Sequence, residues 1–346
     1  MMSGAITLAL DAMGGDAAPD AVIAGAAAAL ERNDGLRYVV YGDEARVEPA
    51  LRHHPALRAS AKVHHTSEIV ADDAKPTTAL RHARGSSMRL AIDAVRRGEA
   101  SAAVSAGNTG ALMAMAKVLL RTLPGIDRPA IASVMPASKR RVVILDLGAN
   151  AECDATNLVQ FALMGSVFAR AVLGVDDPSV ALLNIGTEAL KGDEVVQEAA
   201  RRLRAGELPI RFEGFVEGTG LMAGTVDVVV TDGFTGNVAL KVAEGTARLI
   251  VERVRATLSD SLVARLGYLL AYRRFGRLKA QLDPQRYNGA MFLGLGGIVV
   301  KSHGSANAVG FANAIGVAVD LVRGATNERI GAELNLLRPP LPKVAS

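Results

Sequence analysis

The chain has 346 residues, of which 50% are hydrophobic, 21% are charged and 4% are aromatic. These proportions indicate a compact α/β protein with a sizeable core and exclude a disordered or fibrous chain. The net charge of +4 is mild, so it hints at an acidic partner or a membrane surface without specifying either, and the single cysteine, Cys153, excludes an intrachain disulfide.

Apolar runs and helical periodicity alternate along the whole chain. The apolar runs predict strands at residues 6–10, 38–42, 102–105, 129–135, 141–147, 180–185, 210–216, 226–230 and 298–301. The helical pattern predicts helices at residues 19–32, 44–52, 86–97, 111–120, 157–173, 194–204, 238–258 and 309–323, with a further helical region starting at 75–81. This alternation predicts a largely parallel sheet with helices on both faces.

The ends of the chain give a simple domain plan. Residues 1–335 are expected to form a single α/β domain, and the Pro-rich residues 336–346 an irregular tail. The N-terminus has no basic region ahead of its first strand, so no signal peptide is expected. The longest uncharged stretches are rich in Ala, Gly and Ser and indicate buried βα units, not membrane spans.

Two strand-to-helix turns share one pattern. Residues 105–110 read Ser-Ala-Gly-Asn-Thr-Gly, and residues 231–236 read Thr-Asp-Gly-Phe-Thr-Gly. A glycine-rich turn into a helix gathers free backbone N–H groups and the positive end of the helix dipole, which suits an anion. Either copy alone is explained by an ordinary βα turn, whereas the pair favours one site built from two halves.

Polar side chains gather where the predicted strands end, and open α/β sheets bind ligands beyond the carboxyl ends of their strands. These positions carry Asp11, Gly14, Asp16, Asn108, Thr109, Asp146, Asn150, Asn184, Glu188, Lys191, Asp232, Asn237, Lys301 and His303. Structural needs explain the glycines, but they explain the Asn, Asp and Lys residues less well.

Several common catalytic patterns are missing from the sequence. It contains no G-x-S-x-G elbow, no G-x-x-x-x-G-K-[ST] loop and no dinucleotide-binding fingerprint after the first strand. Cys153 has no partner in the sequence and is interpreted as an inert packed thiol, and the histidines at 53, 54, 64 and 65 lack carboxylates at ligand spacing. The remaining cations and amides suit a reaction in which a bound anion, such as phosphate, is itself the nucleophile.

The motifs together resemble the PlsX family, the bacterial acyl-acyl-carrier-protein:phosphate acyltransferases, from about residue 6 to residue 330. The resemblance rests on residues 11–16, 105–111, 146–150, 184–186, 191–192, 231–237 and 301–304. It implies that inorganic phosphate attacks the thioester of a fatty acyl chain on acyl carrier protein, giving acyl phosphate for phospholipid synthesis. It also implies a three-layer α/β/α sandwich with a largely parallel or mixed sheet and two intertwined halves, similar to isocitrate and isopropylmalate dehydrogenases and to phosphotransacetylase. The family expectation is a homodimer, with no metal, cofactor or nucleic acid.

The resemblance and the residue pattern together give the expected site. Lys191 is expected to bind phosphate or the developing charge, Asn237 to donate a hydrogen bond, and His303 to protonate the departing thiolate. The expected phosphate- and substrate-binding residues are Asp11, Gly14, Gly15, Asn108, Thr109, Gly110, Asn150, Asn184, Asp232, Gly233 and Lys301.

Residues 259–282 form a basic amphipathic segment with apolar residues at helical spacing. Its expected contact residues are Leu266, Leu269, Leu270, Arg273 and Arg274. The segment suits an anionic membrane, a membrane glycerol-phosphate acyltransferase or acidic carrier protein, and a helix packed in a dimer interface is the alternative. We therefore expect a cytoplasmic protein that is peripheral to the inner face of the membrane.

Three other functions stay open on the sequence alone. A phosphotransacetylase-like acyltransferase would take acyl-CoA in place of the carrier-protein thioester. A dehydrogenase on the related fold is disfavoured because a metal-binding carboxylate cluster is missing. A non-catalytic membrane scaffold would tolerate mutation of the turn residues.

Overall fold

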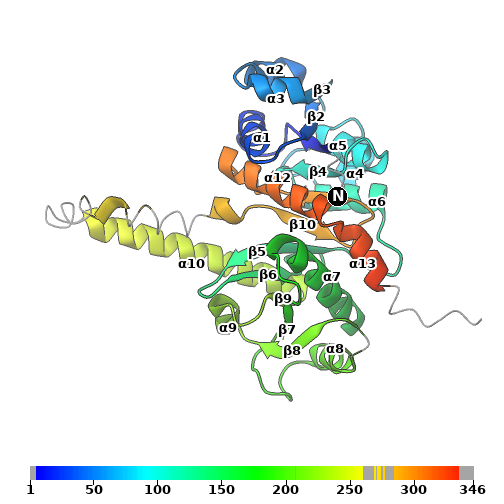
Figure 1. Ribbon diagram of the computed structural model, residues 1–346, viewed down its shortest axis with the longest axis vertical. Coiled ribbons are helices and arrows are strands. Elements are labelled where there is room, and N and C mark those ends of the chain that lie inside the picture. The colour runs from blue at the N-terminus through cyan, green and yellow to red at the C-terminus, as the bar shows by residue number, and fades with distance from the viewer. Residues whose placement is uncertain are drawn as a thin grey trace, which may run out of the picture.

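The structure, a computed structural model, describes residues 5–206, 208–259, 269, 271–273, 276 and 284–334. Within these residues, eleven strands form one sheet in the order β3-β2-β1-β4-β11-β10-β5-β6-β9-β7-β8 (Figure 1). The strands are β1 (Ile6–Asp11), β2 (Leu36–Gly42), β3 (Ala61–His65), β4 (Ala102–Ser105), β5 (Ala130–Pro136), β6 (Arg141–Leu145), β7 (Ser179–Leu183), β8 (Arg211–Val216), β9 (Val228–Val230), β10 (Ala290–Leu293) and β11 (Ile298–Lys301). The helices are α1 (Asp20–Arg32), α2 (Glu44–Arg52), α3 (Pro55–Ser60), α4 (Pro76–His82), α5 (Ser87–Arg96), α6 (Thr109–Leu120), α7 (Ala155–Leu173), α8 (Glu194–Arg204), α9 (Gly218–Ala223), α10 (Gly233–Ser259), α12 (Ala308–Arg323) and α13 (Thr326–Leu334), with a 3-10 turn at Pro284–Tyr287.

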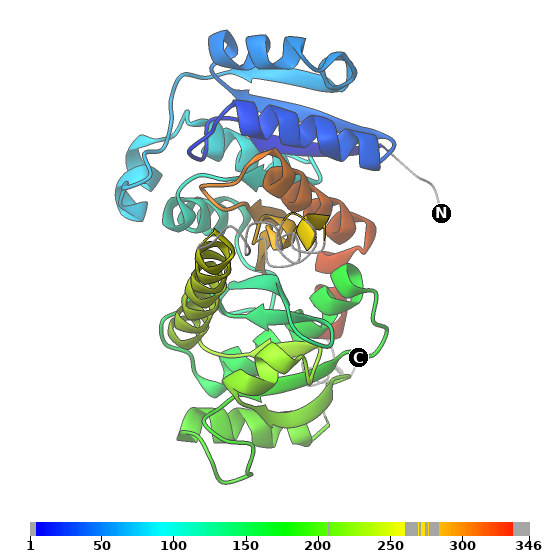
Figure 2. The ribbon, with the colours of Figure 1, turned by 90° about the vertical axis from the view of Figure 1, so that its left-hand side faces the viewer.

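Helices cover both faces of the sheet, which confirms the three-layer α/β/α arrangement (Figures 1 and 2). The strands alternate in the usual way, so that Leu8 and Leu10 of β1 pack on one face and Ala9 on the other. Helices α1, α7, α8, α12 and α13 pack on the first face, and α4, α5, α6, α9 and α10 on the second. Helix α7 is long and apolar enough to cross a membrane, but 72% of its apolar window is buried, as expected of a core helix.

The sheet is mixed, and this changes where the strand ends lie. Strands β1, β2, β3, β4 and β11 are parallel to one another. Strand β10 is antiparallel to both β11 and β5, and β5 is antiparallel to β6, which begins a second parallel group of β6, β9, β7 and β8. The carboxyl ends of the two groups therefore point toward opposite edges of the sheet. The expected sheet was largely parallel or mixed, and the structure shows the mixed form.

Most predicted elements match the structure to within a few residues, but β3, β10, α3, α9 and α13 have no counterpart among the predicted ranges. Strand β10 has four residues, too few to show a period, and it follows a segment without a clear pattern. Helix α9 begins Gly-Thr-Gly, a poor helix-forming sequence, and it ends at Gly224, whose φ is 69°.

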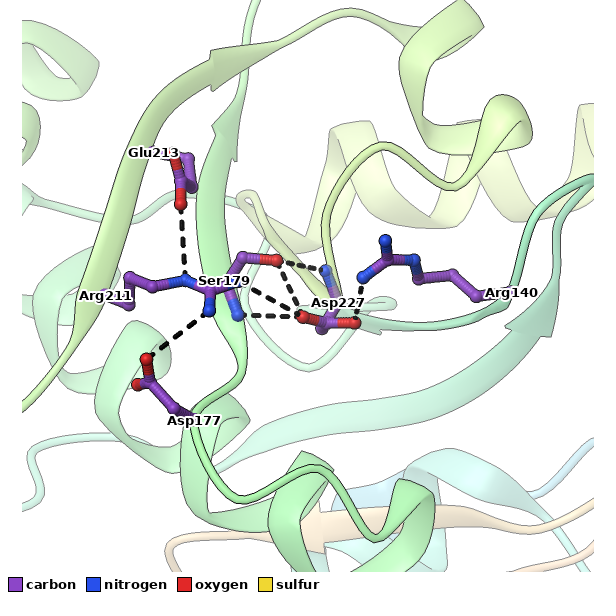
Figure 3. Close-up of polar contacts among 6 residues, drawn as sticks. All are labelled: Arg140, Asp177, Ser179, Arg211, Glu213 and Asp227. Atoms are coloured by element: carbon purple, nitrogen blue, oxygen red, sulfur yellow. Dashed lines mark hydrogen bonds and ion pairs between the residues drawn. The ribbon is translucent and has the colours of Figure 1, made fainter.

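A buried carboxylate holds the amino ends of the strands in the second half together (Figure 3). Asp227, just ahead of β9, accepts hydrogen bonds from the backbone nitrogen (2.9 Å) and the Oγ (2.7 Å) of Ser179 in β7. It also pairs with Arg140 at 2.7 Å, beside β6, and lies 3.9 Å from Arg211 of β8. Burial raises the pKa of Asp227, but the hydrogen bonds from Ser179 and Arg140 outweigh it and bring the pKa below 3.8. One ionised side chain thus links β6, β7, β8 and β9.

We expect Asp227→Ala to lower the free energy of unfolding by about 3 kcal/mol at pH 7, because Ser179 and Arg140 lose their shared acceptor in a buried position. The folded-state pKa is depressed, so this stabilisation is present above the unfolded pKa and is lost as the pH falls through the folded one. Urea unfolding at pH 7 and below pH 4 measures the difference. Asp177→Ala, at a side chain that is 70% exposed, is the matched control, and equal effects of the two changes at pH 7 would refute the network.

Candidate active site

Asp11 organises the first half of the candidate site from the end of β1. Its buried carboxylate accepts hydrogen bonds from the hydroxyls of Ser87 and Ser105, both at 2.6 Å, and from the Met13 backbone nitrogen at 3.2 Å. Burial raises the pKa of this carboxyl, and the hydrogen bonds lower it only in part. Asp11 therefore fixes the loop after β1 to the turn after β4.

The glycines of this half are required by close backbone contact. A Cβ at position 14 would lie 2.5 Å from the backbone nitrogen of Gly107, so the two loops touch main chain to main chain. Gly15 has φ of 97° and lies against Ala106 and the carbonyl oxygen of Gly304. The predicted glycines at 14 and 15 thus bring three loops together at one strand edge.

Asn108 caps α6 instead of presenting its amide to solvent. Its Oδ1 accepts a hydrogen bond from the backbone nitrogen of Ala111 at 2.9 Å, and its Nδ2 donates to the carbonyls of Asp72 (2.6 Å) and Ala74 (3.1 Å). Thr109 and Gly110 follow in the first turn of α6 and are exposed. The Asn108 amide is therefore fully occupied, in contrast to its expected role as a phosphate ligand.

Lys301 is a buried cation at the end of β11. Its Nζ donates to the carbonyl oxygens of Ala106, at 3.1 Å, and of Ser302. Burial lowers the pKa of Lys301 to about 8, against the raising effect of Asp11, Asp72 and Asp16. The positive charge therefore lies directly behind the first glycine turn.

His303 follows two residues later with its ring orientation defined. Its Nδ1 accepts a hydrogen bond from the Ser305 backbone nitrogen at 3.2 Å, so in the neutral ring the proton is on Nε2. Burial lowers the pKa of His303, and the charges of Lys241 and Lys301 lower it further while that of Glu244 opposes them. The ring is consequently neutral at pH 7 and presents an N–H donor.

Asp146 organises the second half in the way that Asp11 organises the first. Its buried carboxylate accepts hydrogen bonds from the backbone nitrogens of Ile131 (2.9 Å) and Asn150 (2.7 Å) and from the Asn150 Nδ2 (2.9 Å). Burial raises its pKa. Gly233 donates its backbone N–H to the carbonyl of Asn150 at 2.7 Å, so Asn150 also positions the second glycine turn.

The second turn differs from the first in the charge of its cap. Asp232 accepts a hydrogen bond from the backbone nitrogen of Thr235 at 2.8 Å, so a carboxylate caps the N-terminus of α10. Asn237, one turn into the helix, donates its Nδ2 to the carbonyl of Leu147 at 3.1 Å. Because Asp232 is itself negative, the α10 N-terminus is a less favourable anion site than the sequence indicated.

Lys191 lies in the loop after β7, next to the second turn, because β7 pairs with β9 up to Leu182 and Val230. Asn184 starts this loop and donates its Nδ2 to the carbonyl of Lys191 at 2.9 Å, which closes the loop on itself. The side chain of Lys191 is exposed and packs beside Gly186, where a Cβ would lie 3.0 Å from its Cγ. The predicted residues Asn150, Asn184, Lys191 and Asn237 therefore share one strand edge.

Helix α10 connects the two halves. It starts at the second turn, and its Lys241 and Glu244, paired at 2.9 Å, lie near enough to His303 of the first half for their charges to shift its pKa. Figure 2 shows α10 crossing the junction of the halves on the same face of the sheet as α4 and α6. Among the hydrogen bonds of the described residues none joins the two turns directly; the halves are joined by the continuous sheet, in which β10 pairs with β11 and β5, and by the packing of α7 on α12 and α13.

Two further placements concern residues outside this cluster. Of the predicted membrane-contact residues, Leu266, Leu270 and Arg274 lie outside the described residues, whereas Leu269 is 66% exposed and Arg273 donates to the Tyr272 hydroxyl at 3.2 Å.

Ser87 was missed by sequence reasoning. The Ser-Ser pair at 86–87 indicated a helix start, but nothing in the sequence links it to Asp11, 76 residues away.

Comparison with known proteins places the chain near phosphate acyltransferases. A family model described as a fatty acid synthesis protein matches residues 6–329. The chain is 60% identical over 344 residues to a phosphate acyltransferase from Rhodospirillum centenum, covering 99% of this chain and 97% of the relative. It is 55% identical to a phosphate acyltransferase from Paramagnetospirillum magneticum, covering 98% and 96%. A phosphotransacetylase from Streptococcus pyogenes shares the fold with a TM-score of 0.60 at 17% identity, covering 93% of this chain and 95% of that one.

The turn geometry yields a paired test within one helix. A Cβ at position 236 would clash with the backbone carbonyl of Asp146, whereas a Cβ at position 245 of α10 has no neighbour within 4 Å. We expect Gly236→Ala to destabilise the fold by about 2 kcal/mol and Gly245→Ala to stabilise it by about 0.5–1 kcal/mol. Chemical unfolding of both variants measures the difference, and a harmless Gly236→Ala would show that the turn does not need close approach.

Proposed function

The chain belongs to the PlsX family of fatty acid synthesis proteins, and from this membership we propose that it transfers a fatty acyl group from acyl carrier protein to inorganic phosphate, releasing acyl phosphate. The family membership makes the chain an acyltransferase of the phosphate acyltransferase type. The observation that carries the proposal is the match to phosphate acyltransferases at 60% and 55% identity over nearly the whole chain.

The reaction sets clear demands on the site. A phosphate oxygen attacks the thioester carbon, a tetrahedral oxyanion forms, and the C–S bond then breaks to release the carrier thiol and acyl phosphate. Phosphate is already anionic, so the site needs no strong base. It must hold the anion beside the thioester and stabilise the oxyanion, for which one well-placed donor supplies about 3–4 kcal/mol.

Lys191 and Asn237 are the residues that we assign to these tasks. Within the described part of the chain Lys191 makes no ion pair, and its loop lies next to the turn that bears Asn237. Lys191 would neutralise phosphate or the developing charge, and Asn237 would donate to phosphate or to the carbonyl. The Asp232 carboxylate, which caps α10, cancels part of the positive potential at the helix N-terminus. The positive charge of Lys191 is therefore needed to bind an anion there.

His303 and Lys301 act from the opposite half. His303 is neutral and holds its proton on Nε2, from which it would donate to the leaving sulfur or to the oxyanion. Lys301 is buried, so its charge is poorly screened by solvent and would attract phosphate toward the first turn. Helix α10 brings this half near the residues of the second.

The runner-up donor is acyl-CoA. The structural neighbours include phosphotransacetylases, such as the Streptococcus pyogenes protein, but at 17% identity this likeness concerns the fold alone. CoA and carrier protein present the same pantetheine thioester, so both donors belong in the assay.

We expect phosphate-dependent release of free carrier protein from palmitoyl-acyl carrier protein, with the rate lowered about 10²–10³-fold by Lys191→Ala and by Asn237→Ala. Lys139→Ala, at an exposed lysine between β5 and β6, is the matched control and should leave the rate unchanged. Palmitoyl-CoA runs beside the carrier-protein substrate, with folding of each variant checked by circular dichroism.

The outcomes of this assay separate the readings. If both variants retain phosphate-dependent turnover, the proposed reaction stands but the roles assigned to Lys191 and Asn237 are wrong. Turnover with CoA alone would establish the runner-up donor. No turnover with either thioester would favour a non-catalytic scaffold.

We also propose that the protein is a homodimer through α10 and touches the membrane through residues 259–282. Helix α10 projects from the body of the molecule (Figure 1) and exposes Phe234, Val238, Val242 and Leu249 at 67, 48, 62 and 52%. Their spacing of four, four and seven residues puts them on one face of the helix. An exposed apolar stripe of this kind suits a second copy of the chain.

Two double variants test these proposals separately. Val242→Glu with Leu249→Glu is expected to give a monomer in analytical ultracentrifugation, because charges replace the centre of the stripe. Leu269→Glu with Leu270→Glu is expected to keep the dimer but reduce co-sedimentation with anionic vesicles several-fold. An unchanged dimer in the first variant, or unchanged vesicle binding in the second, contradicts the respective proposal.

A further inference from the structure

A group of cations that make no ion pair with another described residue lies on α4 and the start of α5. Residues 75–92 contain Lys75, Arg81, Arg84 and Arg89 but no aspartate or glutamate. Lys75, Arg81 and Arg84 are exposed, and Arg89 is half-buried. The ion pairs of the described residues use other arginines, such as the neighbouring Arg96 and Arg97 with Asp93. We call these four cations and the residues between them the α4–α5 surface.

The α4–α5 surface is fixed to the first half of the active site at two points. Ahead of it, Asn108 at the start of α6 donates to the carbonyls of Asp72 and Ala74. Within it, the hydroxyl of Ser87 donates to the buried Asp11 at 2.6 Å. The cations therefore lie on a segment that is tied to both loops of the first glycine turn. Figure 2 shows α4 on the same face of the sheet as α10.

The acidic residues nearest in sequence do not neutralise this surface. Asp72 and Asp73 directly precede it, but the charge of Asp72 acts on the buried Lys301. Glu68 accepts the backbone N–H of Gly85 at 2.9 Å, so this one carboxylate lies beside Arg84 and offsets only part of the charge of the four cations. The α4–α5 surface therefore keeps a net positive charge beside the site where the acyl group is transferred.

The arrangement suits a protein partner better than a small anion. A phosphate site needs donors that converge on one point, whereas these cations are spread over α4, its link to α5 and the first turn of α5. Lys75 and Arg81 alone are separated by about 9 Å along the helix axis at 1.5 Å per residue. Cations dispersed at this spacing match the acidic side chains of a helical protein and steer its approach.

We propose that the α4–α5 surface is the docking surface for the acidic carrier protein that delivers the acyl thioester. The proposal rests on the proposed function, because only a carrier-bound donor needs such a surface. Docking here places the carrier beside the first glycine turn, with α10 and the second half within reach of its flexible thioester arm. An anionic membrane or a nucleic acid would also be attracted by these cations, but neither has to reach the acyl-transfer site.

The test reverses two of the charges. Arg81→Glu with Arg84→Glu is compared with Arg52→Glu plus Lys62→Glu, a control that reverses two exposed cations outside the α4–α5 surface, on α2 and on the edge strand β3. Three readouts are taken on the full chain: titration with carrier protein, KM and kcat for palmitoyl-acyl carrier protein, and turnover of octanoyl-pantetheine, a donor without a carrier. Circular dichroism and thermal unfolding establish that each variant is folded, and Arg81→Gln with Arg84→Gln provides a milder second variant.

We expect the reversed α4–α5 variant to raise KM for palmitoyl-acyl carrier protein about tenfold and to weaken carrier binding by the same factor, while octanoyl-pantetheine turnover and the control variant stay at wild-type levels. The glutamine variant should show a smaller rise, and added salt should raise the wild-type KM more than that of the reversed variant. Wild-type KM in the reversed variant overturns the proposal, and so does an equal loss with octanoyl-pantetheine.

The same experiment distinguishes failure of the docking surface from failure of the proposed function. If the wild type turns over neither thioester, the proposed function fails and the titration alone decides: weaker carrier binding by the reversed variant keeps the docking surface, and equal binding overturns it. Parallel titrations use anionic vesicles and duplex DNA. Loss of either interaction with carrier binding intact overturns the proposal in favour of that ligand.

Discussion

Two buried carboxylates at strand ends hold the rest of the site in place. Asp11 accepts the hydroxyls of Ser87 and Ser105, and Asp146 accepts the main chain of Ile131 and Asn150. Burying a carboxylate is costly unless hydrogen bonds compensate, so each forces the surrounding loops into one arrangement. The glycines are a consequence, because loops drawn this close leave no space for a Cβ at Gly14 or Gly233. The site is therefore a set of loops clamped around two carboxylates.

Asp11 and Asp146 lie in strand groups that run in opposite directions. The loops around one carboxylate are therefore not automatically close to the loops around the other. Strands β10 and β5 reverse the sheet, so the halves do not share one carboxyl edge. Helix α10 starts at the second glycine turn, near Asp146. Its residues Lys241 and Glu244 lie close enough to His303 for their charges to shift the pKa of that ring. Through these two residues, α10 places charge from the second half close to His303 of the first.

The sequence predicted the parts of this arrangement that depend on local pattern. The strand-turn-helix units around Asn108 and Asn237, and the equivalence of their turns, follow from apolar runs and glycine spacing, and the three-layer fold follows from the alternation of strands and helices. The direction of β10 and the partners of Asp11 depend on contacts between residues far apart in the chain, which periodicity does not encode. The roles of Asn108 and Asp232 as caps were also missed, although both types favour N-caps, because the same residues equally suit a ligand site.

These caps change the electrostatic picture of the site. In an open glycine turn the helix N-terminus supplies the positive potential for an anion, worth about 0.3–2 kcal/mol. Here Asn108 already accepts one N–H of α6, and the charge of Asp232 opposes the dipole of α10. On the proposed function, the potential that would attract phosphate comes from side chains, with Lys301 buried behind the first turn and Lys191 exposed beside the second. A buried cation provides a fixed field and an exposed one can follow the anion as its charge shifts to the acyl oxygen. The division of the positive charge between the halves therefore matches a reaction in which negative charge moves from phosphate to the thioester carbonyl.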